Sequence, residues 1–342
     1  RRLQERNQQQ SAVGKDMRLR VWLWSLGIVI ALAAAVVFVE RVTRPAAETL
    51  SVALPLPTET TRRSRGPVPP APASPTYDEV FAEGARLGDE IASAFPGSGE
   101  ALALSGRVFF TFGKSSQAKA WLEKAVTLDP MTADAWLAMA ELARLEGDFP
   151  KSVECMRRLA KANPRLAKEK VFVLADSLLK LGSAKEAVDV LEDCGKDAPL
   201  PTWACVMLGR GYYQLKDYQR SADQYRKALD DPKESSVAHY GLSSALMRLG
   251  RQDEARKYRE DYARVEVKNL AVFDRMQHAG TQEERHEGAG WYPFLAQFHL
   301  QAGRLYANHG DAEQAEKHWL RAWALAPDRP EPRQLLGSLH KW

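Results

Sequence analysis

The side chains best suited to bind a metal or move protons gather in one short polar stretch. They are His278, Glu283, Glu284, His286 and Glu287. Their spacing matches no standard metal site, and polar loops commonly contain His and Glu. The sequence also lacks glycine-rich phosphate-binding loops, a nucleophile elbow and the paired-histidine zinc motif. We therefore expect no catalytic residue, no metal, no cofactor and no enzyme activity, with a metal-binding or enzymatic role of residues 270–295 as the alternative.

The three cysteines form no recognisable redox or zinc motif. Their number is odd and no two of them are spaced as C-x-x-C. Cys194 and Cys205 are expected on helices that pack against each other, where an oxidising compartment would permit a disulfide. Buried free thiols are the commoner outcome for isolated cysteines in helices. Both states of this pair stay open.

Glycine and proline recur along the sequence at a nearly fixed interval. Gly113 and Gly147 are 34 residues apart, as are Pro130 and Pro164. Gly182 follows after 35 residues. No alternating pattern of strands occurs between these positions, so each interval is expected to hold two helices and their turns.

Small and large residues recur with the same period. The small residue expected where the two helices of a unit cross falls on Gly106, Ala140, Ala175, Gly209, Ser243 and Gly303. The small residue near the start of the second helix falls on Ala118, Ser152, Ala187, Ser221, Ala255 and Ala315. The large residue four positions later is Leu122, Met156, Leu191, Tyr225 and Trp319, whereas the fifth unit has Arg259. Small residues let two helices approach closely, and large ones fill the space between units.

In these residues the sequence resembles the tetratricopeptide repeat (TPR) family. The resemblance implies an all-α fold, a right-handed TPR α-solenoid of about six helix-turn-helix units within residues 77–342. The units are expected at 99–132, 133–166, 168–201, 202–235, 236–269 and 296–329. Tyr77–Phe95 and the helix expected at 330–342 look like caps for the two ends, which a solenoid needs because each unit covers its neighbour.

Residues 270–295 interrupt the period between the fifth and sixth units. We predict one long helix from Asp253 to about Gln277, followed by a polar, glycine-containing loop that starts at His278. An insertion in a solenoid lies on one face and is often functional. A tolerated surface loop is the equally weighted alternative.

The TPR resemblance also implies which side chains line a concave surface formed by the first helices. The candidate partner-binding residues are Arg107, Phe110, Arg144, Phe172, Lys180, Trp203, Arg210, Tyr213, Tyr240, Arg248 and Arg304. Glu141, Asp176 and Ser244 are expected on the same surface. The Lys and Asn clamp of chaperone-tail-binding TPR domains is not reproduced. Arginine and aromatic residues are favoured anchors of protein interfaces, so we expect a protein or peptide partner, with acidic groups near Arg210 and Arg248.

An uncharged apolar segment, Val21 to Val39, precedes the repeats. A helix of this length spans about 28 Å, which suits a hydrocarbon core of about 30 Å. Six basic residues precede the segment and two follow closely. We therefore expect a basic cytoplasmic tail at 1–20, a transmembrane helix at 21–39 and an extracytoplasmic (periplasmic in a bacterium) repeat domain.

A cleavable signal peptide is the alternative, because small residues such as Ala33 and Ala35 suit a cleavage site. The apolar run continues to Val39, which favours an uncleaved anchor. Residues 40–76 are rich in proline and poor in large apolar residues, so we expect an extended linker. Its simplest role is a spacer, although Pro-rich segments also serve as ligands of partner domains.

The charge distribution bears on the class of partner. Residues 1–76 hold 11 Lys and Arg against 5 Asp and Glu, which leaves 37 basic and 39 acidic residues for the repeats. A nucleic-acid-binding domain would concentrate basic residues on its folded surface, so we exclude nucleic acid. We expect a membrane-anchored interaction scaffold, and an oligomerising structural subunit is a further alternative. Bacterial inner-membrane proteins of this layout serve in secretion, cytochrome maturation and envelope assembly, a resemblance of layout only.

Overall fold

The computed structural model describes residues 76–196, 199–283 and 290–339, and all regular structure within them is helical. The all-α, TPR-like architecture predicted from the period is thereby confirmed. The predicted tail, membrane helix and linker at 1–75 lie outside the described residues. Within the described part, no helix combines the length and the apolar character needed to cross a membrane.

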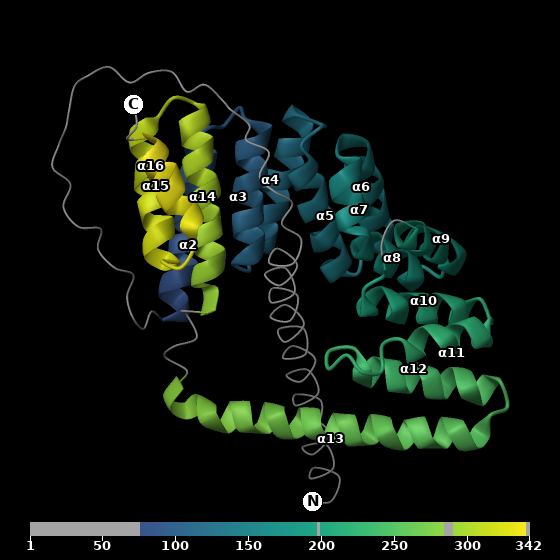
Figure 1. Cartoon of the computed structure of the whole chain (residues 1–342). Coiled ribbons are helices and arrows are strands. Elements are labelled where there is room, and N and C mark those ends of the chain that lie inside the picture. The colour runs from purple at the N-terminus through teal and green to yellow at the C-terminus, as the bar shows by residue number, and fades with distance from the viewer. Residues whose placement is uncertain (1–75, 197–198, 284–289, 340–342) are drawn as a thin grey trace, which may run out of the picture. The chain divides into compact units, whose positions relative to one another are not determined.

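The helices form antiparallel pairs joined by short turns (Figure 1). The pairs are α3 (Gly99–Thr111) with α4 (Ser115–Leu128), α5 (Ala133–Glu146) with α6 (Phe149–Ala162), α8 (Val171–Lys180) with α9 (Ala184–Gly195), α10 (Thr202–Gln214) with α11 (Tyr218–Arg226), α12 (Ser235–Arg248) with α13 (Gln252–Glu283), and α14 (Tyr292–Asn308) with α15 (Ala312–Leu325). Three helices stand outside these pairs, namely α2 (Tyr77–Ala94), α7 (Pro164–Glu169) and α16 (Pro330–Leu339).

The turn inside each pair depends on a residue in the left-handed backbone region. Gly147 has φ of 81° and ends α5, and the side chain of Asp148 then accepts a hydrogen bond from the backbone N–H of Lys151 at the start of α6. Glycine adopts this conformation without strain, which explains why it marks the period. In the fourth pair the same place is taken by Lys216, with φ of 64°.

Close packing of the paired helices follows the predicted positions. A Cβ atom added at Gly106 would lie 2.6 Å from Leu122 Cγ, and one at Gly209 would lie 2.9 Å from the ring of Tyr225. All the predicted small positions are buried, as are the large residues four positions after the small residue of each second helix. The exception is Arg259, which is exposed. The spacing of small and large residues therefore sets how closely the two helices of a unit cross.

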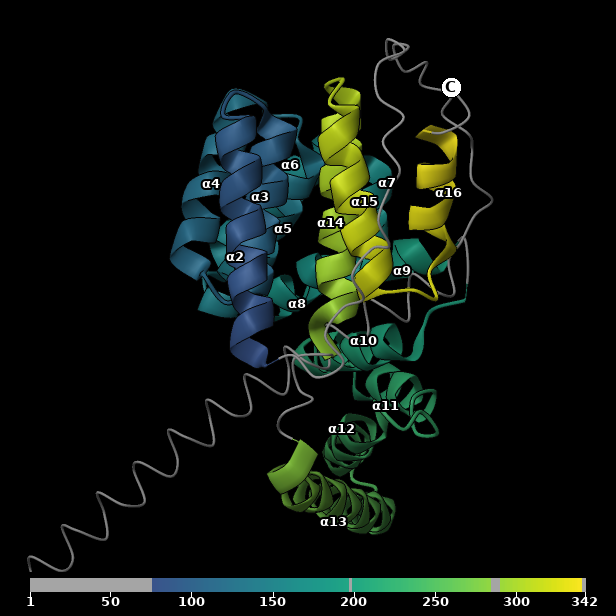
Figure 2. The same cartoon turned by 90° about the vertical axis from the view of Figure 1, so that its left-hand side faces the viewer.

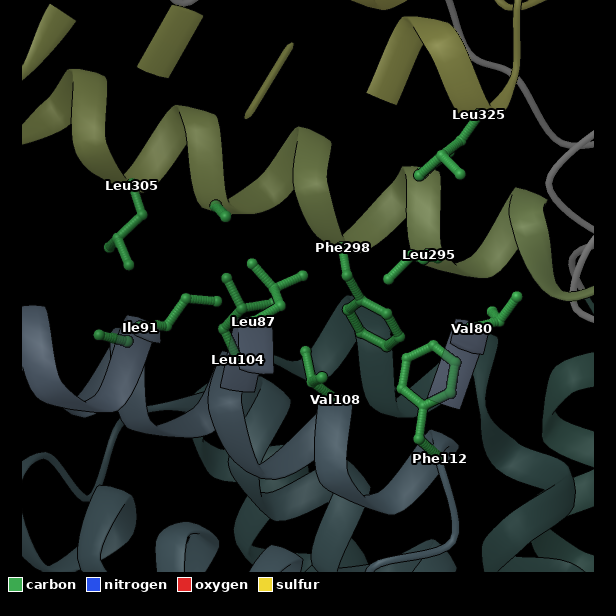
Figure 3. Packing of buried hydrophobic residues seen from close by; sticks show 13 residues of the cluster. Val80, Leu87, Ile91, Leu104, Val108, Phe112, Leu295, Phe298, Leu305 and Leu325 are labelled. Carbon is green, nitrogen blue, oxygen red and sulfur yellow. The ribbon is translucent and has the colours of Figure 1, made fainter. Parts of the chain in front are cut away.

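The sixth pair does not continue from the fifth. Figures 1 and 2 show α14 beside α2 and α3, which it contacts directly. In Figure 3, Leu295, Phe298 and Leu305 of α14 face Leu87 of α2 and Val108 of α3 across one apolar cluster. The sixth unit thus packs before the first one, although it comes last in the sequence.

This placement corrects the role expected for Tyr77–Phe95. The segment forms α2 and packs on α3, as a cap would. Its other side is covered by α14 and α15, so it lies between two units and does not end the array. At the other side of α15, α16 contributes Leu336 to a second cluster with Trp319.

The long helix α13 explains how α14 comes to lie beside α2 and α3. It has 32 residues and ends at Glu283, so residues 278–283 are helical and the predicted loop there is wrong in this part. At 1.5 Å per residue its length is about 48 Å. Helices packed side by side are about 8–10 Å apart, so this length matches a row of about five helices. The end of α13 can therefore reach back to the side of the array where α2 and α3 lie.

Candidate functional site

The candidate partner-binding side chains lie on the first helix of each pair, here called the first-helix row. Contacts run from α14 to α3, then to α5, α8, α10 and α12. Arg304 on α14 therefore lies at the α3 end of the row, and not beyond Arg248 as the order of the sequence suggests. It is half exposed and pairs with Glu331 of α16 at 3.1 Å. Arg304 therefore stays on the first-helix row, at the end opposite Arg248, because α13 carries α14 back to α2 and α3.

Arg107 links three helices at that end of the row. One guanidinium nitrogen lies 2.9 Å from Asp134 Oδ2 on α5 and 3.5 Å from Gln301 Oε1 on α14. The guanidinium also lies over the ring of Phe298, with its central carbon 6.0 Å from the ring centroid. These contacts fix the side chain of Arg107 against its neighbours and leave it partly exposed.

The middle of the row holds two arginines around one carboxylate. Asp176 on α8 lies 3.5 Å from Arg144 of α5 and 3.8 Å from Arg210 of α10. Asp176 and Arg144 are largely buried, and the buried Nε of Arg144 has no hydrogen-bond acceptor among the described residues. Both ion pairs are long and Arg210 is 38% exposed, so the guanidinium of Arg210 can still donate to an arriving carboxylate.

Glu141 is recessed on the same face, one turn before Arg144. No hydrogen bond and no ion pair to another described residue reaches its carboxylate. Burial raises the pKa of Glu141, and the nearby charges of Lys170, Arg107 and Arg144 oppose that rise. The middle of the row therefore combines a carboxylate that no described residue pairs with and the partly exposed guanidinium of Arg210, which suits the alternating N–H and C=O groups of an extended peptide.

Tyrosines and arginines gather at the α12 end of the row. Arg248 Nε donates to the hydroxyl of Tyr213 at 3.3 Å, which joins α10 to α12. Tyr240 is 49% exposed, and its ring lies 5.5 Å from that of Tyr262 on α13. The guanidinium of Arg259 lies 5.7 Å from the Tyr240 ring centroid. This end of the row offers flat aromatic surface with cationic donors beside it.

The remaining predicted residues divide between packing and solvent. Phe172 and Trp203 are half-buried, and their rings meet edge to face across α8 and α10 with centroids 5.9 Å apart. Phe110 is half-buried, and Lys180 is exposed at the end of α8. The structure thus brings together Arg144 with Arg210, and the Phe172 ring with Trp203.

Sequence reasoning missed two features of this region. Asp134 and Gln301 were not identified as partners of Arg107, because both depend on which helices become neighbours. A buried polar cluster between α2, α14 and α15 was missed altogether; its members are Glu83, Glu90, His299, His318 and Arg321. No local pattern signals it, since Glu83 and Arg321 are 238 positions apart.

The cysteines add no site among the described residues. Cys155 and Cys205 are buried free thiols, and Cys194 is half-buried. No group of three or more potential metal ligands occurs among the described residues. The candidates at His278, Glu283, Glu284, His286 and Glu287 lie outside the part whose side chains are described.

Several solved structures are similar to this chain. MamA (residues 41 to the end) from Desulfovibrio magneticus RS-1 has 20% identity and a TM-score of 0.44, covering 54% of this chain and 96% of its own. The APC/C heterotetramer Cut9–Hcn1 has 15% identity and a TM-score of 0.43, covering 77% and 47%. Pseudomonas aeruginosa PilF has 19% identity and a TM-score of 0.39, covering 77% and 99%. At these values none of them informs the function of this chain.

No curated protein is significantly similar in sequence to this chain. The tetratricopeptide repeat family model matches residues 103–167, 137–198 and 206–264. These ranges run from α3 into α13, where the helix pairs, the small crossing residues and the left-handed turn residues all recur with the TPR period. The chain therefore carries tetratricopeptide repeats within residues 103–198 and 206–264.

Proposed function

We propose that this chain is a membrane-anchored scaffold whose first-helix row binds an extended segment of a partner protein. The carrying observation is the partly exposed guanidinium of Arg210 in the middle of the row, which lies 3.8 Å from the Asp176 carboxylate that it shares with Arg144. A guanidinium paired this loosely can still donate hydrogen bonds to the carbonyl or carboxylate groups of a bound peptide.

The composition of the row favours an acidic segment. Arg144 and Arg210 share the single carboxylate of Asp176, and the partner of Arg248 among the described residues is the hydroxyl of Tyr213. Arginine and tyrosine together are typical anchors of protein interfaces. Charge-assisted hydrogen bonds from these arginines would orient the acidic groups of the partner along the row.

The location is the second part of the proposal. The uncharged segment Val21 to Val39 and the basic residues before it support an anchor with the repeats outside the cytoplasm, in the periplasm of a bacterium. There the scaffold would gather partners for secretion or for assembly of an envelope complex. A reporter fused after Trp342 is expected to be active only outside the cytoplasm, and cytoplasmic activity would refute this topology.

Photo-crosslinking tests which face binds the partner. A photoreactive amino acid replaces the exposed Tyr240 on the row or, as a matched control, the exposed Gln219 on the second helix α11. With the full chain in its own membranes, we expect one defined adduct from position 240 and none from 219. Adducts of equal yield from both positions would show that the row is not the binding face.

The adduct identifies a partner for titration. Replacing Arg210 and Arg248 by alanine is expected to weaken binding by about thirtyfold or more, the effect of losing about 2 kcal/mol at an interface hot spot. Arg157→Ala is the control, because Arg157 forms an exposed ion pair with Glu186 on the second helices. Equal affinity of the double variant and the wild type, at equal stability, would contradict the proposal.

A further inference from the structure

The junction between α2 and the returning helices contains two buried histidines. His299 of α14 is 7% exposed and His318 of α15 is 2% exposed. Their Nδ1 atoms lie 2.9 Å apart, and the ring of Tyr306 stacks on His318. Two imidazoles in such contact need one proton between them, because one nitrogen must donate and the other must accept.

Each imidazole also faces a carboxylate of α2. His299 Nε2 lies 3.2 Å from Glu83 Oε1, within hydrogen-bond distance. His318 Nε2 lies 3.3 Å from Glu90 Oε1, at ion-pair distance but outside hydrogen-bond geometry. Ionised carboxylates only accept hydrogen bonds, so both Nε2 atoms are stabilised by carrying a proton.

Other charged and titratable groups surround this pair. Arg321 of α15 donates two hydrogen bonds of 2.6 Å to Glu83, and Lys317 lies 3.8 Å from Glu90. The other charged or titratable groups on the helices around this pair are Arg107 of α3, Tyr292 and Tyr306 of α14, and His309 at the C-cap of α14. The two carboxylates of α2 are thus already balanced by two permanent cations before either histidine becomes charged.

The number of protons that the two imidazole rings can hold while keeping these contacts is limited. Three protons satisfy all the contacts, one on each Nε2 and one shared between the Nδ1 atoms. A fourth proton would place two N–H groups against each other at 2.9 Å and add a second positive charge. The junction therefore accepts three protons and is opened by a fourth.

We propose that the His299–His318 contact makes the attachment of α14–α16 to α2 sensitive to pH, so that mild acid opens this junction while the neighbouring repeats stay closed. The opened junction would uncover the apolar cluster formed by Leu87 and Ile91 of α2 with Phe298 of α14. Because α14 to α16 follow a long connecting helix, they can separate without disturbing α5 to α11.

The direction of the pH effect follows from linkage. Burial lowers the pKa of His299 below 6.5, although Glu83 opposes this shift. The closed junction is limited to three protons, whereas the open one can take up a fourth, so closure weakens as the pH falls below 6.5. Glu83, with a pKa of about 2, and Glu90, whose pKa the neighbouring imidazole of His318 lowers, stay ionised over this range.

Hydrogen exchange of the full chain, read by mass spectrometry at pH 7.5 and 5.5 and corrected for intrinsic rates, tests the proposal. The opening constant of amides in α2 and α14 is expected to rise about five- to tenfold, the effect of one proton taken up by a group of pKa 6.5. Amides of α5 and α6 serve as an internal control and are expected to change much less. An equal change in all of these helices would overturn the proposal.

Two variants isolate the histidine contact. His299→Phe keeps an aromatic ring but removes the titration, so the pH dependence of opening is expected to disappear. His239→Gln on α12, outside the junction, is expected to retain it. Should His299→Phe fail to fold, an NMR titration of the wild-type imidazole decides, since a pKa of His299 at or above 6.5 would overturn the proposal.

Discussion

The packing inside one repeat can be tested by adding a single carbon atom at Gly303. A Cβ atom at this position would lie 2.5 Å from Trp319 Cδ1 and 2.9 Å from the carbonyl oxygen of Ala315. The first contact is with a buried ring and the second with backbone, so neither can move aside easily. Trp319 Nε1 also donates to Leu300 O at 3.2 Å, which holds the ring in place.

The expected effect of Gly303→Ala is the difference between a cost and a gain. Overpacking costs about 1–3 kcal/mol. Displacing the Trp319 hydrogen bond costs about 0.5–1.5 kcal/mol more. Alanine is favoured over glycine in a helix by about 1 kcal/mol, which offsets part of this. We therefore expect the free energy of unfolding to fall by about 2 kcal/mol.

A matched substitution separates packing from helix propensity. Gly337 lies within α16, and a Cβ atom there would meet no other atom within 4 Å. Gly337→Ala is expected to stabilise the protein by up to about 1 kcal/mol, the propensity gain alone. Urea unfolding followed by circular dichroism gives both values. If Gly303→Ala were as stable as Gly337→Ala, the close approach of α14 and α15 would be wrong.

Three further outcomes are expected. Thr76→Ala removes the capping box at the start of α2 and should lower the free energy of unfolding by about 1 kcal/mol, measured by urea titration. Burial raises the pKa of the Cys155 thiol to about 11, so at pH 8 its alkylation in the folded protein should be far slower than in the urea-unfolded protein, followed by peptide mass analysis. Burial opposes ionisation of Glu83, yet Arg321 and His299 lower its pKa to about 2. The ionised carboxylate should therefore contribute about 3 kcal/mol of stability at neutral pH. The wild type is expected to lose this stability between pH 4.5 and 2, whereas Glu83→Gln should show no such loss.

The repeats themselves were predictable because their signals are local. Gly106, Leu122 and Gly147 recur with one period, and each acts within its own unit or turn. The fold class and the buried small positions follow from that period alone. The pairing of row residues is also partly periodic, since Arg144, Asp176 and Arg210 come from consecutive units.

The position of the sixth unit was not predictable from the same signals. Gly303 and Trp319 would pack together in the same way whichever unit lay next to them. The contact of α14 with α2 depends instead on the length and direction of α13, which no repeated residue encodes. The histidine pair and the place of Arg304 were missed for this reason.

The return of α14 to α2 has a consequence for synthesis of the chain. About 200 residues separate Leu87 from Leu295, which meet in one cluster. At about 5–20 residues per second, a ribosome needs about 10–40 s to make the intervening chain. During that time the apolar sides of α2 and α3 remain uncovered, because α14 has not yet been made. A solenoid built in chain order covers each face within one repeat, whereas this nascent chain exposes its first face until nearly the end.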